Sequence, residues 1–154
     1  MKVISRLVII GILAGALLAG LLKLVYVATG NKAYVLLYNV DYIPILNRWE
    51  STPIVGITFH FVFCIASVVG LYFILRLIHL EKRILPYFLT YTAGSGILYF
   101  LTALSDKPPA ANDVEAWLYW TLSHAAYSIL VAELIIHWLH RQESLPGKTL
   151  HTET

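Results

Sequence analysis

Three nitrogen bases, Lys23, His60 and His124, lie inside long apolar segments of the sequence. An ionisable side chain is costly in hydrocarbon unless it is paired, hydrated or neutralised, so intramembrane bases often mark a functional site. An imidazole ordinarily titrates at about pH 6.5 and gains charge when the medium acidifies. Two facing histidines also suit axial ligation of haem b or binding of a divalent metal ion. These residue types therefore predict proton uptake or ligand binding, with metal coordination by His60 and His124 as an alternative.

Small and polar residues accompany both histidines at helical spacing, because residues three or four apart share a helix face. The face of His60 holds Gly56, Cys64 and Ser67, and the face of His124 holds Trp117, Trp120, Thr121 and Ser128. Such faces suit the interior of a helix bundle better than lipid. Ser67 and Ser128 therefore join the three bases as candidate ligand-binding or proton-binding residues.

A second ionisable pair, Glu133 and His137, follows one helical turn apart, roughly opposite His124 on the same segment. A proton relay, a local hydrogen bond and a contact with another subunit each account for this pair. Glu133 is therefore also a candidate proton-binding residue.

An ordinary structural role is the competing interpretation of these residues. Neutral histidines can bond to tyrosine, serine or a backbone carbonyl, and Lys23 can extend its ammonium outward along its apolar stem. Catalysis is not favoured, because Ser123 and His124 point about 100° apart on a helix and the sequence holds no nucleophile elbow or phosphate loop. We predict no catalytic residue. The single cysteine, Cys64, is expected to be a small core residue.

The overall composition is typical of a membrane protein. Of the 154 residues, 58% are hydrophobic and 13% are charged, and the mean hydropathy is +0.72. Charged residues usually reach about a quarter of a soluble domain. The chain therefore has too few polar side chains to cover a soluble surface, and we expect one integral membrane domain in contact with the lipid bilayer. No basic run interleaves with aromatic residues, so nucleic acid is not an expected partner.

Four apolar segments reach the roughly 20 residues that a helix needs to cross a bilayer. The sequence thus predicts an all-α, four-helix transmembrane bundle within residues 1–140, with helices at about 7–28, 53–80, 86–104 and 113–140. A signal peptide is the competing interpretation of the first segment. Small residues recur there at every fourth position, which lets another helix approach closely. One row is Gly11, Gly15 and Ala19, and the other is Ala16 and Gly20, which follow Ile12 at the same spacing.

Local signals predict where the helices begin and what joins them. Ser51 or Thr52 can cap the second helix ahead of Pro53, Pro86 opens the third, and Asn112 caps the fourth, with Glu115 three residues later. The outer loop, 29–52, carries tyrosines and a tryptophan suited to the headgroup region, and we expect it to be ordered with a short helix. Residues 141–154 form a polar cytoplasmic tail in this prediction.

Positive charges predict that both ends of the chain face the cytoplasm. With four crossings, the ends and the turn after the second helix share one side, and that side is richer in lysine and arginine. Helices two and four then both start at the outer face. His60 lies about seven residues after Pro53 and His124 about nine after Glu115, so at 1.5 Å per residue the two share one level within roughly one turn. With Lys23 at a similar level, an outward-facing polar pocket of all three bases is expected.

Several short motifs in this order resemble the YagU-like family of small bacterial inner-membrane proteins. They are Gly-Ile-Leu-Ala-Gly before Lys23, Gly56-Ile-Thr with His60, the Val69-Gly70-Leu-Tyr72 run, Pro108-Pro109 and Ser123-His124. The similarity runs from Gly11 to about His140, with Lys23, His60 and His124 at matching positions. It departs at Gly30-Asn31-Lys32-Ala33-Tyr34, where the family has a proline- and arginine-rich stretch. The resemblance implies a multi-pass protein of the bacterial inner membrane, associated with acid resistance.

Three functions from different classes remain open at this point. The first is a proton-responsive or transport-related membrane protein in which charging of His60 and His124 loosens the bundle. The second is a haem- or metal-binding protein that uses the same two histidines. The third is a scaffold or accessory subunit whose small-residue faces bind a partner membrane protein or form a homo-oligomer.

Overall fold

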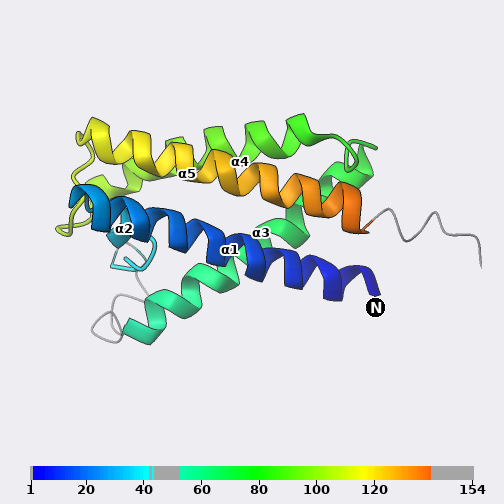
Figure 1. Ribbon diagram of the computed structural model, residues 1–154, viewed down its shortest axis with the longest axis horizontal. Helices are drawn as coiled ribbons and strands as arrows, with labels where there is room; N and C mark the ends of the chain where they lie inside the picture. The colour runs from blue at the N-terminus through cyan, green and yellow to red at the C-terminus, as the bar shows by residue number, and fades with distance from the viewer. Residues whose placement is uncertain (1, 42, 44–52, 140–154) are drawn as a thin grey trace, which may run out of the picture.

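The structure, a computed structural model, describes residues 2–41, 43 and 53–139, and this part of the chain is helical with no strand. The long helices are α1 (Lys2–Thr29), α3 (Pro53–Leu77), α4 (Ile84–Leu98) and α5 (Val114–Glu133) (Figure 1). A 3-10 turn, η2 (Tyr99–Leu104), extends α4, and a π-helical turn, η3 (Leu134–Leu139), extends α5. A short helix, α2 (Ala33–Leu36), follows α1. The all-helical prediction is confirmed, while the tail at 141–154 lies outside the described residues.

Four of these helical segments are long and apolar enough to cross a membrane. Their outward surfaces carry large apolar side chains, such as Leu24 on α1, Ile74 on α3, Ile97 on α4 and Leu122 on α5, each more than half exposed. Such a surface is stable in contact with lipid and unfavourable in water. The chain is therefore a multi-pass membrane protein that contacts the lipid bilayer.

Two helix starts differ from the sequence prediction. The cap of α5 is Asp113, whose carboxylate accepts a hydrogen bond from the Ala116 amide at 2.9 Å, so the prediction of Asn112 was wrong by one position. Helix α4 begins at Ile84, and Pro86 lies inside its first turn. Proline is tolerated there because first-turn amides have no intrahelical acceptor. Pro53 does begin α3, while the expected caps Ser51 and Thr52 lie outside the described residues.

Helices α1 and α3 meet along a seam that glycine makes possible. A Cβ atom built on Gly11 would lie 2.7 Å from the Cα of Ile65, and one on Gly15 would lie 3.2 Å from the Cys64 sulfur. Both glycines are buried, whereas Gly20 faces open space. Of the two small-residue rows in α1, the row of Gly11 and Gly15 is therefore the one that packs. Absence of a side chain lets the helix backbones approach closely and gain dispersion contacts.

A second seam joins α4 to α5 through tryptophan. The indole N–H of Trp117 donates to the Gly96 carbonyl at 3.0 Å, and that of Trp120 donates to the Ser95 carbonyl at 2.9 Å. Both acceptors lie just before α4 gives way to the 3-10 turn. A carbonyl oxygen has two lone pairs, so it can accept the indole in addition to a backbone amide. These bonds hold the faces of α4 and α5 in register.

Close backbone contacts join α4 to α5, α1 to α3 and α1 to α5, so α1 and α5 lie between the outer helices α3 and α4. Helix α3 crosses α1 obliquely in Figure 1. Within the described residues, α3 makes no comparable set of close backbone contacts with α4 or α5. This incomplete side of the bundle is where a cavity forms.

Candidate functional site

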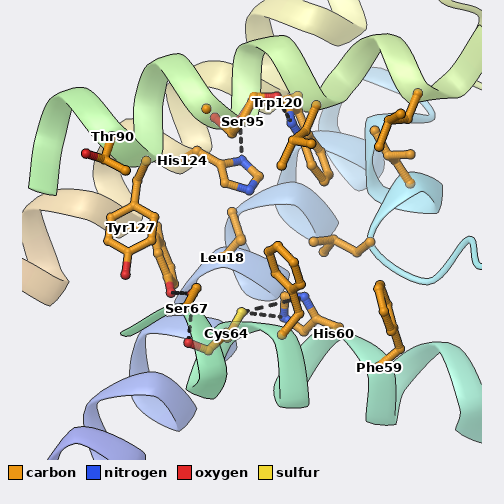
Figure 2. Close-up of a pocket in the computed structure, with 17 residues that line it drawn as sticks. Leu18, Phe59, His60, Cys64, Ser67, Thr90, Ser95, Trp120, His124 and Tyr127 are labelled. Atoms are coloured by element: carbon orange, nitrogen blue, oxygen red, sulfur yellow. Dashed lines mark hydrogen bonds between the residues drawn. The ribbon is translucent and has the colours of Figure 1, made fainter. Parts of the chain in front are cut away.

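A cavity of about 370 Å³ lies between α3 on one side and α4 and α5 on the other (Figure 2). Leu18 of α1 borders it, and Leu36 and Leu37 cover its end near α2. Volumes of this order are typical of sites for small molecules. His60 and His124 both line this cavity, so the structure brings together two side chains that the sequence places on different helices.

His60 extends from α3 and is almost fully buried, with 5% of its surface exposed. Its Nε2 atom lies 3.0 Å from the carbonyl oxygen of Gly15 on α1. A carbonyl only accepts hydrogen bonds, so Nε2 must carry the proton and donate it. Nδ1 is then an acceptor, and its neighbour is the Cys64 sulfur at 3.9 Å, which is at most a weak donor. The helix seam therefore sets both the ring orientation and the tautomer of His60.

His124 reaches the cavity from α5. Its Nδ1 atom donates to the carbonyl oxygen of Trp120, one turn earlier in the same helix, at 2.8 Å. The ring centroids of His124 and Trp120 lie 4.3 Å apart. Nε2 is consequently the acceptor in the neutral ring. In Figure 2 the ring projects from α5 on one side of the cavity, and His60 lies on the opposite side with Leu18 between them. Each neutral histidine thus donates its single ring N–H group to a backbone carbonyl.

Hydroxyl groups complete the polar part of the cavity. Ser67 of α3 donates to the Cys64 carbonyl at 2.9 Å, and its oxygen lies 3.5 Å from the hydroxyl of Tyr127 on α5. Tyr91 of α4 lines the same space, and its buried hydroxyl has no hydrogen-bond partner. The Tyr91 and Tyr127 rings meet edge to face, 5.1 Å apart. A buried hydroxyl without a partner is unfavourable, so a hydrogen bond to the Tyr91 hydroxyl would stabilise the cavity.

Apart from Thr90 and Ser95, the rest of the cavity lining is apolar, and the lining carries no formal charge. None of the lining residues is aspartate, glutamate, lysine or arginine. The described residues also contain no group of three or more His, Cys, Asp or Glu side chains placed to hold a metal ion. Zinc sites in proteins use at least three protein ligands. The arrangement can accept hydrogen bonds or protons through two imidazoles, and it offers a metal only those two histidines.

Lys23 does not line the cavity, so the expected pocket of three bases is corrected to one of two. The lysine is exposed, and its ammonium lies 4.9 Å from the ring centres of both Tyr26 and Tyr34. The aromatic faces and the long stem together carry the charge outward, which is the ordinary structural role. Lys23 is placed by these rings, and not by contact with either histidine.

A row of aromatic rings nevertheless leads from Lys23 to His60. Tyr34 and Tyr38 meet edge to face at 5.1 Å, and Tyr38 meets His60 at 6.0 Å. Burial raises the pKa of the Tyr38 phenol, and the neighbouring Tyr34 hydroxyl raises it further, so Tyr38 stays neutral at physiological pH. Gly56 allows this arrangement, because a Cβ atom there would clash with the carbonyl oxygen of Tyr38.

The remaining candidates fall into two groups. Ser67 lines the cavity, whereas Ser128 is fully buried and donates to the Ala125 carbonyl at 2.6 Å. Glu133 pairs with His137 through atoms 2.8 Å apart, with both side chains partly exposed. The pair lies where α5 passes into its π-helical turn, away from the cavity. Ser128 and Glu133 thus have structural partners, and neither lines the two-histidine cavity.

Sequence reasoning missed three tyrosines at the site: Tyr38, Tyr91 and Tyr127. Tyr127 follows His124 by one helical turn, so its spacing was a usable signal. Nothing in the segment around Tyr91 marks this residue as facing a histidine. Tyr38 belongs to the loop, whose return onto α3 depends on the tertiary fold.

Comparison of the chain with models of known protein families, with curated proteins and with solved structures found no match.

Proposed function

We propose that the chain is a proton-responsive or transport-related protein of the bacterial inner membrane, with both ends in the cytoplasm and a role in acid stress. The observation that supports this most is the pair of histidines, His60 and His124, that line one uncharged cavity. The resemblance to the YagU-like family supports the location in the bacterial inner membrane and the role in acid stress. The orientation rests on the excess of positive charge at the ends and in the turn after α3.

The groups around the two histidines cannot neutralise the charge of an imidazolium. The titratable groups around them are Tyr38 beside His60, Cys64 on α3, Tyr91 on α4 and Tyr127 on α5. From α1 the neighbours are Leu18 and the Gly15 carbonyl, which carry no charge. None of these groups offers a negative charge at neutral pH.

An imidazolium in this cavity would therefore need water in place of a counter-ion, and two would also repel each other. The side of α3 that faces α4 and α5 has few close contacts to break. Protonation should consequently favour a more open and hydrated cavity. In the proposed orientation the α2 end of the bundle, where Tyr38 meets His60, faces the outer medium.

Tryptophan fluorescence of the ligand-free protein tests this proposal, because the Trp120 ring lies 4.3 Å from the ring of His124. The purified protein is titrated from pH 7.5 to pH 5, and its oligomeric mass is measured at both ends. We expect a sigmoidal change in emission for the native protein and a flat response for the double variant His60→Phe, His124→Phe. Phenylalanine keeps the ring and cannot be protonated, and the other histidines remain as an internal baseline. An equal response from the double variant would refute the proposal.

A further inference from the structure

We infer that the two-histidine cavity binds a neutral, membrane-soluble aromatic alcohol of the phenol or hydroquinone class, whose hydroxyl groups donate hydrogen bonds to His60 and His124. This inference rests on the proposed function for its biological setting, because it uses the same two histidines. It requires the neutral form of both rings, so the two proposals can fail separately.

The hydrogen-bonding pattern of the cavity selects a hydroxyl group. The N–H groups of His60 and His124 are already used by the carbonyls of Gly15 and Trp120, so each histidine offers only a lone pair. The Tyr91 hydroxyl is buried without a partner. A ligand hydroxyl can donate to an imidazole and accept from a phenol at the same time. A ketone, an ether or a hydrocarbon has no hydrogen to donate to either histidine.

The lining selects a flat and uncharged molecule. Helices α3, α4 and α5 contribute aromatic rings to the wall of the cavity. These rings are those of Phe59, Phe63, Tyr91, Trp120 and Tyr127. Rings of this kind pack favourably against another ring, in stacked or edge-to-face contact. With no charged side chain in the lining, a charged ligand would lose its hydration without compensation.

The position of the opening indicates that the ligand enters from the membrane. Phe63 of α3 is 53% exposed and Leu98 of α4 is 44% exposed, and both also line the cavity. Side chains that are exposed and also line a cavity mark its mouth, so the mouth lies between α3 and α4. These two helices lack close mutual packing, and their outer surfaces face lipid. A solute already dissolved in the bilayer can therefore reach the histidines without crossing water.

Binding to the full chain in lipid nanodiscs at about pH 8, where an ordinary imidazole is neutral, tests the inference. The probes are hexylhydroquinone, kept under argon, and its dimethyl ether, which has the same ring and tail without a donor. Equilibrium dialysis measures the bound probe above that in empty nanodiscs. We expect saturable binding of the hydroquinone and at least about 10-fold weaker binding of the ether. Equal affinity for the two probes would overturn the inference and show a cavity that selects by size alone.

Variants locate the hydrogen bonds. His60→Phe and His124→Phe should each weaken hydroquinone binding about 10-fold while leaving the affinity for the ether unchanged. Hydroquinone binding that both variants retain in full would also overturn the inference. The comparison of the two probes on the native protein does not depend on any variant folding. Hydroquinone binding without a pH response in the ligand-free protein would refute the proposed function and leave this inference standing. A pH response without hydroquinone binding would refute this inference and leave the proposed function standing.

Discussion

The two sides of α3 differ in how closely they pack against the rest of the bundle. On the side toward α1, a Cβ on Gly11 would lie 2.7 Å from Ile65, and the backbones nearly touch. On the side toward α4 and α5, His60, Cys64 and Ser67 line an open cavity of about 370 Å³. Helix α3 is therefore held mainly from one side.

The difference separates the residues that stabilise the bundle from those that are available to a ligand. In the α4–α5 seam, both tryptophan indoles are satisfied within the protein, as the Trp117 indole is by the Gly96 carbonyl. In the cavity, the Tyr91 hydroxyl and the Nε2 atom of His124 have no partner among the described residues, and the Nδ1 atom of His60 has only the weak Cys64 thiol. We expect stability and binding to respond to different substitutions, and the following changes test this, from the largest effect to the smallest.

Gly11→Leu should cause the largest loss of stability. The added side chain would occupy the space of the Ile65 backbone and force α1 from α3, at a cost of about 3 kcal/mol. Thermal unfolding in detergent, followed by circular dichroism, measures the change. Gly20→Leu is the matched control, because nothing lies within 4 Å of that position and the same gain in helix propensity applies. Equal stability of the two variants would show that the α1–α3 seam is not tight.

Trp117→Phe and Trp120→Phe should each lower the free energy of unfolding by about 1 kcal/mol, since each removes one indole hydrogen bond to α4. They should differ in binding, because Trp120 lines the two-histidine cavity and Trp117 does not. Unfolding and hydroquinone dialysis on both variants compare the two effects. Weakened binding in Trp117→Phe, with the fold intact, would contradict the separation of seam from cavity.

Asp113→Ala should destabilise the start of α5 by about 1 kcal/mol, through loss of the hydrogen bond from the carboxylate to the Ala116 amide. Asn112→Ala should change the unfolding free energy by less than half as much, since the structure assigns the cap to Asp113. Denaturation midpoints of the two variants decide between them. A larger loss in Asn112→Ala would restore the cap expected from the sequence.

Gly94→Leu should have the smallest effect on stability and a large one on binding. Gly94 lines the cavity, and a Cβ there meets nothing within 4 Å. We expect an unfolding free energy within about 0.5 kcal/mol of the native value, because no packed atom has to move. The same substitution should abolish binding of both hydroquinone and its dimethyl ether. A fully folded variant that still binds either probe would place the ligand elsewhere.

Much of the architecture could be predicted because membrane helices depend on local composition. An apolar run near 20 residues long can satisfy its backbone in lipid only as a helix, so the four crossings follow from the sequence. The small-residue row at Gly11 and Gly15 was a similar signal, and the structure confirms it as a contact face. The cap at Asp113 was missed because Asn112 and Asp113 are both good caps, and the choice depends on where the preceding turn ends.

The sequence alone determined that the protein lies in a membrane, that it is helical, and that His60 and His124 face the bundle interior, since hydrophobicity and helical period are properties of single segments. Only the tertiary structure decided that these two histidines share one cavity while Lys23 rests on Tyr26 and Tyr34 outside it. The crossing of α3 over α1, and the lack of close packing between α3 and α4, result from how several helices pack together. That packing depends on side chains far apart in the sequence, so no single segment encodes it.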